Sequence, residues 1–237
     1  MKVPVLAYHK IDLPTPDVKI RGAYTSPHRF EKQILYLKKR AFDFFTASEL
    51  IGFYLENGRF PENAICITFD DGWKDNYANA FPILKKFNIK ATIFLVPSCI
   101  GAVTAQVTAD GEGEREHLSM ADIREMSASG IEFGSHSMNH KLFDRIEPAE
   151  IEREVVDSRN YIEDLLQKPC EVFAYPAGLF TDFAREMVRL SGYKAAFSTV
   201  YGPADIVDRF ALNRTEILRR DGLPFQFSRK IRSIFPG

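Results

Sequence analysis

The stretch AICITFDDG, residues 64–72, joins an uninterrupted apolar run to two adjacent carboxylates and a glycine. Such a run is typical of a strand buried on both faces, as in a parallel sheet covered by helices. In parallel α/β folds, functional sites are built at the carboxyl ends of the strands. Asp70 and Asp71 therefore stand where chemistry is expected, although an Asp-Gly turn that leads into a helix accounts for them equally well.

Short apolar runs alternate with amphipathic stretches along the whole chain, without an internal repeat or a linker-like segment. This alternation predicts one domain over residues 1–237, with parallel strands and outer helices, in either a barrel or an open doubly wound sheet. Strands are expected at 3–8, 42–45, 64–69, 91–96, 131–134, 170–174, 195–198 and 209–212. Helices are expected from Ser26-Pro27 to Leu37, from the capping-box sequence at 46–49 onward, and over 73–87, 119–128, 148–166, 182–190 and 224–234.

The composition limits the partners. The 237 residues hold 31 basic and 32 acidic side chains, a formal charge of −1, with no block of Lys or Arg. A nucleic-acid or anionic-membrane partner is therefore not expected, because it requires a basic face. No apolar window approaches the roughly 20 residues of a membrane span, and the run after Met1 is too short for a signal peptide. We expect a cytoplasmic protein, although an exported protein trimmed of its signal would have the same sequence.

The segment 102–117 interrupts the alternation. It contains DGEGERE, residues 110–116, and shows no apolar period. We expect a mobile surface loop here, either a lid over a substrate cleft or a tolerated surface insertion.

The segment HSMNH, residues 136–140, follows the strand expected at 131–134 and places two of the five histidines four residues apart. If the backbone begins a helical turn there, both imidazoles lie on one face and can share an ion. Asp71 is the natural third ligand. Two histidines and one carboxylate leave a position open for water, which is typical of a catalytic metal site.

Two further strand ends carry marked residues. The strand expected at 170–174 leads into Tyr175-Pro176-Ala177-Gly178, a turn whose backbone N–H groups could face a developing oxyanion. His9 follows the first expected strand. Taken alone, each is explained by loop geometry or packing. All of these features, however, fall at the same end of their strands, and that convergence favours a single site.

The segment TFDDG, residues 68–72, resembles the first motif of the polysaccharide deacetylase superfamily, and HSMNH resembles the second, His-(Ser/Thr)-x-x-His. The resemblance runs from Leu6 to Arg214. It implies an α/β fold, a distorted (β/α) barrel that commonly has seven strands. It also implies an N-acetylated glycan as substrate, from which hydrolysis releases acetate.

The resemblance further implies roles for individual residues. Asp71, His136 and His140 would hold a divalent metal ion, usually zinc in such enzymes. Asp70 would act as the general base. The oxyanion of the tetrahedral intermediate would lie between the metal and the backbone N–H of Ala177.

The chain departs from the common pattern in two motifs. The third motif often holds an arginine, and a tyrosine before its glycine, where this chain has Phe173-Ala-Tyr-Pro-Ala177-Gly178. The general-acid histidine often found in a C-terminal Leu-x-His motif is replaced by Leu212-Asn213-Arg214. The early Tyr8-His9 instead resembles the branch that includes poly-β-1,6-N-acetylglucosamine deacetylases, and we expect His9 to be the acid. Arg214 is expected to pair with Asp70 and hold it ionised, or to form only a surface or structural ion pair.

Substrate contacts and the choice of reaction stay open. Trp73, Tyr175 and Tyr8 could offer apolar faces to a pyranose ring, or could simply pack in the core. The same metal centre could cleave small non-sugar or cyclic amides, because loops set substrate choice. A carbohydrate-binding relative that has lost catalysis would explain the missing C-terminal histidine and third-motif arginine.

Overall fold

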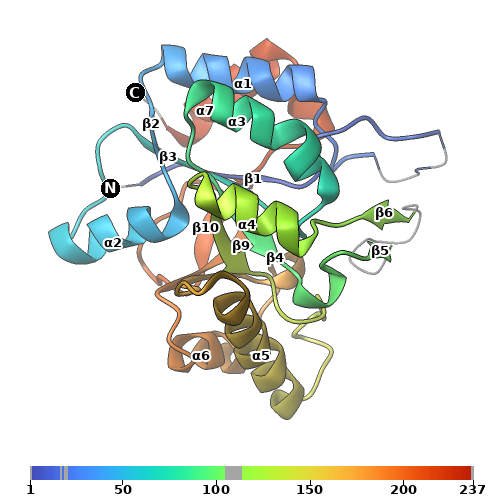
Figure 1. Ribbon diagram of the computed structural model, residues 1–237. Helices are drawn as coiled ribbons and strands as arrows, with labels where there is room; N and C mark the ends of the chain where they lie inside the picture. Colours follow the sequence, from blue (N-terminus) through green and yellow to red (C-terminus); the bar gives the residue numbers. More distant parts are fainter. Residues whose placement is uncertain (1, 17, 19–20, 105–113, 236–237) are drawn as a thin grey trace.

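The computed structural model describes residues 2–16, 18, 21–104 and 114–235. Its strands are β1 (Val5–Tyr8), β2 (Asp43–Phe45), β3 (Ala64–Phe69), β4 (Thr92–Leu95), β5 (Val103–Thr104), β6 (Arg115–Glu116), β7 (Glu132–Ser135), β8 (Val172–Ala174), β9 (Ala195–Tyr201) and β10 (Leu212–Glu216). Its α-helices are α1 (Pro27–Lys39), α2 (Ala47–Asn57), α3 (Phe81–Phe87), α4 (Met120–Ala128), α5 (Pro148–Leu166), α6 (Asp182–Leu190) and α7 (Pro224–Ile234) (Figure 1).

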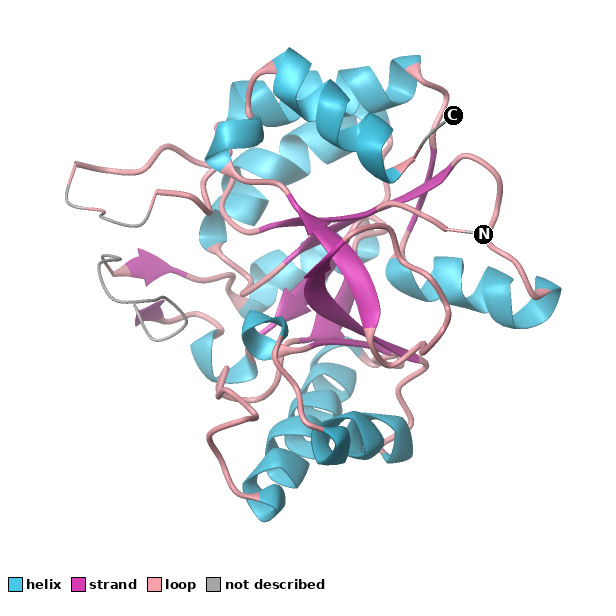
Figure 2. Ribbon diagram, turned by 180° about the vertical axis from the view of Figure 1, so that it is seen from behind, coloured by secondary structure: helices cyan, strands magenta, loops and turns pink. Residues whose placement is uncertain are grey.

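Seven parallel strands close into a barrel. They follow the order β1-β10-β9-β8-β7-β4-β3, and β1 pairs again with β3 to complete the ring. The short strand β2 pairs with the first half of β3, below the point where β4 begins to pair with it. The helices surround the strands (Figure 2). The expected α/β fold, a seven-stranded (β/α) barrel, is confirmed.

The alternation of side chains along β3 decides what faces the barrel interior. Ile65, Ile67 and Phe69 pack with the apolar residues of the surrounding helices, whereas Ala64 and Cys66 belong to a second cluster with side chains of the other strands. Successive side chains of a strand point to opposite faces. Residues 68 and 70 therefore continue the inward-facing row, and Asp70 arrives at the carboxyl end of the barrel.

Phe94 fills much of the barrel interior and requires a glycine opposite it. A Cβ atom on Gly134 would lie 2.7 Å from Cδ1 of Phe94 and 2.8 Å from the carbonyl oxygen of Val172. Above Phe94 lies the guanidinium of Arg214, at 5.4 Å from the ring centroid. The apolar floor of the barrel thus ends where its charged residues begin.

Most helix boundaries follow from capping residues in the sequence. Ser26 accepts a hydrogen bond from the backbone N–H of Arg29, and Thr46 forms the expected capping box with Glu49. The helix expected over 73–87 instead begins with a π-helical turn at Asn76–Ala80 and continues as α3. Pro82 lies at this junction, and proline provides no N–H for a helical hydrogen bond.

Two expectations about segments change. The last barrel strand is β10, not residues 209–212, because its alternating polar residues conceal a strand with a buried Arg214 and Thr215. In the segment 102–117, β5 and β6 form an antiparallel pair. The mobile loop or lid that we expect there falls largely on residues 105–113, which lie outside the described residues. The single domain over 1–237 stays a prediction.

Within the described parts of the chain, no helix combines the length and the apolarity that crossing a bilayer demands.

Candidate metal centre and active site

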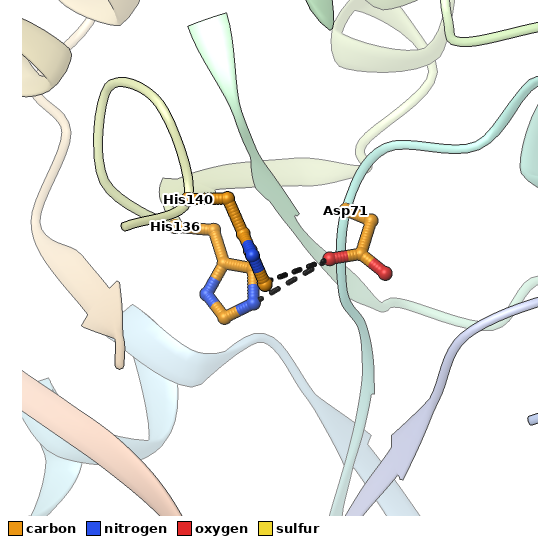
Figure 3. A group of neighbouring side chains, drawn as sticks. All are labelled: Asp71, His136 and His140. Atoms are coloured by element: carbon orange, nitrogen blue, oxygen red, sulfur yellow. Dashed lines mark ion pairs between the residues drawn. The ribbon is translucent and has the colours of Figure 1, made fainter. Parts of the chain in front are cut away.

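Asp71, His136 and His140 come together at the carboxyl end of the barrel. One ligand atom from each lies within 4.8 Å of the other two. Oδ1 of Asp71 is 3.6 Å from Nε2 of His136 and 3.5 Å from Nε2 of His140 (Figure 3). The three atoms converge without close hydrogen bonds among themselves, and two imidazoles with a carboxylate are one of the donor sets found at catalytic metal sites. The residues therefore fit a divalent metal.

Neighbouring groups orient two of these three side chains. The indole N–H of Trp73 donates to Oδ2 of Asp71 at 2.9 Å, which leaves Oδ1 for the histidines. Nδ1 of His136 lies 2.7 Å from the carbonyl oxygen of Ala174, at the end of β8. A carbonyl only accepts, so Nδ1 carries the proton and Nε2 presents its lone pair. Burial lowers the pKa of His136 to about 4, which keeps the ring neutral near pH 7.

His140 is brought to the site by a loop, not by the helical turn that its spacing suggests. Ser137 and His140 both have left-handed backbones, with φ of 65° and 56°. The two imidazole centroids are 4.9 Å apart. The expectation that the two rings lie close together holds, but the proposed helical face was wrong.

Asp70 and Arg214 form a buried bidentate ion pair. Nη1 and Nη2 of Arg214 lie 2.7 and 2.8 Å from the two carboxylate oxygens, and the side chains are 0% and 2% exposed. Nε of Arg214 donates to the carbonyl oxygen of Ser198 on β9. Burial opposes ionisation of Asp70, but the Arg214 guanidinium outweighs it and holds the pKa of that carboxyl well below its ordinary value. Burial excludes a surface ion pair for Arg214, whereas a purely structural pair and a pair that serves to hold Asp70 ionised have the same geometry.

His9 lies beside this pair. Its Nε2 is 4.0 Å from Oδ2 of Asp70, and its side chain is 21% exposed, so the ring faces both the carboxylate and solvent. Asn76 donates a hydrogen bond to the carbonyl oxygen of His9 at 2.9 Å. The geometry suits a group that exchanges protons with a bound molecule.

Ala177 occupies the expected turn after β8. Its backbone is left-handed, with φ of 53°. The turn is held by bonds from the N–H of Gly178 to the carbonyl of Tyr175 and from the hydroxyl of Thr199 to the carbonyl of Ala177. Neither of these bonds involves the N–H of Ala177, which is the donor expected to face an oxyanion.

The expected sugar-stacking faces do not fit the structure. Trp73, Tyr175 and Tyr8 are each 0% exposed. Their polar atoms are also bound inside the protein: the Tyr175 hydroxyl donates to the carbonyl of Phe210, and the Tyr8 hydroxyl donates to Gln33. The alternative of core packing describes all three rings, and Trp73 additionally orients Asp71.

Sequence reasoning missed several residues that support the site. His117 stacks on Trp73, with centroids 4.2 Å apart, and its Nδ1 lies 3.1 Å from the carbonyl oxygen of Asp71. Nζ of Lys10 lies over the Trp73 ring, 4.1 Å from its centroid. Glu154 is a buried acid on α5 that contacts the loop of His140. Its position on the apolar side of an amphipathic helix is a signal that the sequence contains.

A closed (β/α) barrel with two histidines and an aspartate at its carboxyl end, next to a second buried aspartate, defines the class of metal-dependent barrel hydrolases. The family model for polysaccharide deacetylase matches residues 57–196. The chain belongs to the polysaccharide deacetylase family. The matched range includes Asp70, the three candidate metal ligands and the Ala177 turn, whereas His9 and Arg214 lie outside it.

Individual relatives agree with the family match. YxkH of Bacillus subtilis (strain 168), named for the same family, is 26% identical over 91% of this chain and 71% of its own. The poly-beta-1,6-N-acetyl-D-glucosamine N-deacetylase of Staphylococcus aureus (strain MSSA476) is 31% identical over 76% of this chain, which spans 62% of that protein. The Streptococcus pyogenes deacetylase PplD, solved in complex with acetate, is 26% identical, covers 97% of this chain and 98% of its own, and superposes with a TM-score of 0.82.

Proposed function

We propose that this chain hydrolyses the N-acetyl groups of a polysaccharide or oligosaccharide of N-acetylated amino sugars, releasing acetate and leaving a free amine on the sugar. The observation that carries the proposal is the convergence of Asp71, His136 and His140 beside the buried Asp70–Arg214 pair. The relatives support the choice of substrate, since one is named as a deacetylase of poly-β-1,6-N-acetylglucosamine and another was solved with acetate.

In this proposal Asp71, His136 and His140 hold a divalent metal, and we propose zinc because two imidazoles and a carboxylate are a common zinc donor set. When bound, zinc lowers the pKa of a coordinated water and polarises the amide carbonyl. The neutral state of His136 suits this role, because a ligating imidazole needs an unprotonated nitrogen.

Asp70 is the proposed general base. It is ionised at neutral pH and lies at the end of the strand that also supplies Asp71. Its lowered pKa makes it a weak base, so the proton from the attacking water is held only briefly. We propose that this proton passes to His9, whose Nε2 is 4.0 Å away, and restores its protonated form for the next turnover.

His9 is the proposed general acid, and Ala177 the proposed oxyanion donor. Protonated His9 donates to the leaving nitrogen, because an unprotonated amine leaves poorly. The N–H of Ala177 would stabilise the negative oxygen that forms on the carbonyl carbon. A main-chain donor performs this role whatever the side chain, which is compatible with alanine where many relatives of the family have tyrosine.

The two other functions considered from the sequence are less well supported. A binding domain without catalysis has no need of an acid, a base and metal ligands, and the residues that we propose for these roles lie together at one barrel end. No feature of the described residues favours a small non-sugar amide over a glycan.

Acetate release from N-acetylglucosamine oligomers tests the proposal. Oligomers of β-1,6 and β-1,4 linkage and a simple acetamide are offered to metal-stripped and to zinc-restored protein. We expect acetate only from the oligomers and only with zinc. Release from the simple amide alone would contradict the substrate class, and equal release by metal-stripped protein would contradict the metal dependence.

A further inference from the structure

Glu154 is a buried acid in the second turn of α5. It lies on the helix face that also buries Ile151, Val155 and Ser158, and it is 2% exposed. Among the described residues no basic side chain forms an ion pair with it. Buried carboxylates without a counter-charge need hydrogen-bond donors to offset their desolvation. The donors that Glu154 uses therefore indicate what it holds in place.

Within the described part of the chain, the side chain of Glu154 accepts hydrogen bonds only from the loop between the two histidines. Oε2 accepts from the backbone N–H of Asn139 at 2.7 Å, and Oε1 accepts from its Nδ2 at 2.7 Å. The carbonyl oxygen of Glu154 also accepts from the backbone N–H of Met138 at 3.0 Å. One residue of α5 thus binds two consecutive residues that immediately precede His140.

We call these three hydrogen bonds accepted by Glu154 the clamp. They hold the loop between the two residues whose backbone conformation is least favourable. Ser137 and His140 are left-handed, a conformation that is uncommon for residues other than glycine, although Asn, Asp and His adopt it more often than the rest. Three further bonds hold the loop: the N–H of His140 donates to the hydroxyl of Ser137 at 3.0 Å, the N–H of Ser137 donates to the hydroxyl of Ser135, and the N–H of Ser98 donates to the carbonyl of Met138. His136 has its own anchor on the carbonyl of Ala174, whereas the position of His140 depends on the loop.

We propose that Glu154 is a positioning residue for the metal centre: its carboxylate fixes Asn139, and through Asn139 it sets His140 at its distance from Asp71. The inference rests on the proposed metal site of the preceding subsection. Groups of this kind, one bond removed from a ligand, typically change metal affinity about 10- to 100-fold when they are altered.

The test removes the hydrogen-bond donor at residue 139 and then supplies a donor at residue 154 instead. Asn139→Asp sets a second carboxylate against Glu154 and removes the Nδ2 donor. Adding Glu154→Gln returns a donor to this contact, while the glutamine oxygen still accepts the backbone N–H of residue 139. Glu152→Gln, at an exposed position of the same helix, is the matched control for the loss of one negative charge.

Zinc dissociation constants are measured by competition with a chelating dye, together with the absorption spectrum of the Co²⁺-substituted protein and the melting temperature of the metal-free protein. We expect Asn139→Asp to weaken zinc binding about 10- to 100-fold and to alter the Co²⁺ spectrum. The zinc dissociation constant of the double variant should return to within about threefold of the wild-type value. That of Glu152→Gln should equal the wild-type value, because only groups that hold the ligands in place are expected to change metal affinity.

Three results would overturn the inference. Asn139→Asp could bind zinc like wild type, or the double variant could remain as weak as the single one. The loss of affinity could also merely follow a fall in the melting temperature of the metal-free protein, which would indicate a general structural role. If Asn139→Asp does not fold, Glu154→Asp shortens the same contact and must weaken zinc binding. Failure of the wild type itself to bind zinc would instead overturn the proposed metal site.

Discussion

The guanidinium of Arg214 binds both carboxylate oxygens of Asp70, at 2.7 and 2.8 Å, and the two side chains are 0% and 2% exposed. The arginine comes from β10 and the aspartate from the end of β3, with β1 between these two strands in the barrel. The pair therefore ties three neighbouring strands together across the opening in which the candidate site lies.

Removing Arg214 alone should be costly for the fold. Arg214→Met leaves the Asp70 carboxylate buried without its partner, and we expect the free energy of unfolding to fall by about 3–5 kcal/mol. The double variant Asp70→Asn/Arg214→Met should recover a large part of this loss. Urea denaturation of the metal-free proteins measures both changes. A single variant that loses less than about 1 kcal/mol would mean that the pair behaves like an exposed one.

Replacing the proposed acid or base should reduce turnover even in protein that remains folded. Asp70→Asn also leaves the buried Arg214 guanidinium without its carboxylate, so its turnover is compared with wild type under conditions in which both proteins are folded. Asp70→Asn and His9→Ala are each expected to reduce acetate release about 10²- to 10⁴-fold, because each removes one proton transfer. Zinc content, measured on the same samples, should stay at the wild-type value. Near wild-type turnover in either variant would show that its assigned role is wrong.

Metal binding should stabilise the folded chain. A ligand that binds only the folded state at 100 times its dissociation constant adds about 2.7 kcal/mol to the free energy of unfolding. We expect zinc to raise the melting temperature of the metal-stripped wild type, and a chelator to reverse this. His140→Ala should abolish most of the shift; a variant that retains all of it would place the zinc elsewhere.

Asp75 should make stability depend on pH. Burial is the main cause that raises its pKa from 3.8 to about 7, so the folded state holds a proton that the unfolded chain has lost. The stabilising contribution is present below pH 3.8 and is lost as the pH rises toward 7. Oδ1 of Asp75 accepts from the N–H of Ile11 and from Nδ2 of Asn76, and an asparagine oxygen can do the same.

Asp75→Asn should therefore lose less stability than wild type between pH 4 and pH 7. Denaturation of the two metal-free proteins at intervals across this range gives the comparison. Parallel curves would show that Asp75 titrates alike in the folded and the unfolded chain.

The sequence predicts the barrel well because its strands and helices carry strong local signals. The bounds of β3, α5, α6 and α7 agree with the expected ranges, since apolar runs, capping residues and helix-starting prolines mark their ends. The last strand was misplaced because Arg214 and Thr215 are buried polar residues in a short strand. The burial of Arg214 depends on its partner Asp70, more than a hundred residues away in the chain, which no local pattern reveals.

The convergence of the candidate metal ligands could be predicted from the sequence, but the residues that hold them in place could not. Sites of parallel α/β folds form at the carboxyl ends of the strands. This alone predicts that Asp71, His136 and His140 lie close together, without knowledge of the loop path. The backbone of that loop and the clamp by Glu154 come from tertiary contacts. For Trp73 the sequence left a sugar-binding face and core packing open, and its burial against His117 and Lys10 could be found only in three dimensions.

The most direct test of the account is a zinc titration of metal-stripped protein with acetate release from a β-1,6-linked N-acetylglucosamine oligomer as the readout. We predict that activity rises linearly, reaches its plateau at one zinc per chain, and is absent at every zinc concentration in His136→Ala. Full activity without metal, or an unchanged titration in His136→Ala, would contradict the claim that Asp71, His136 and His140 form a catalytic metal centre.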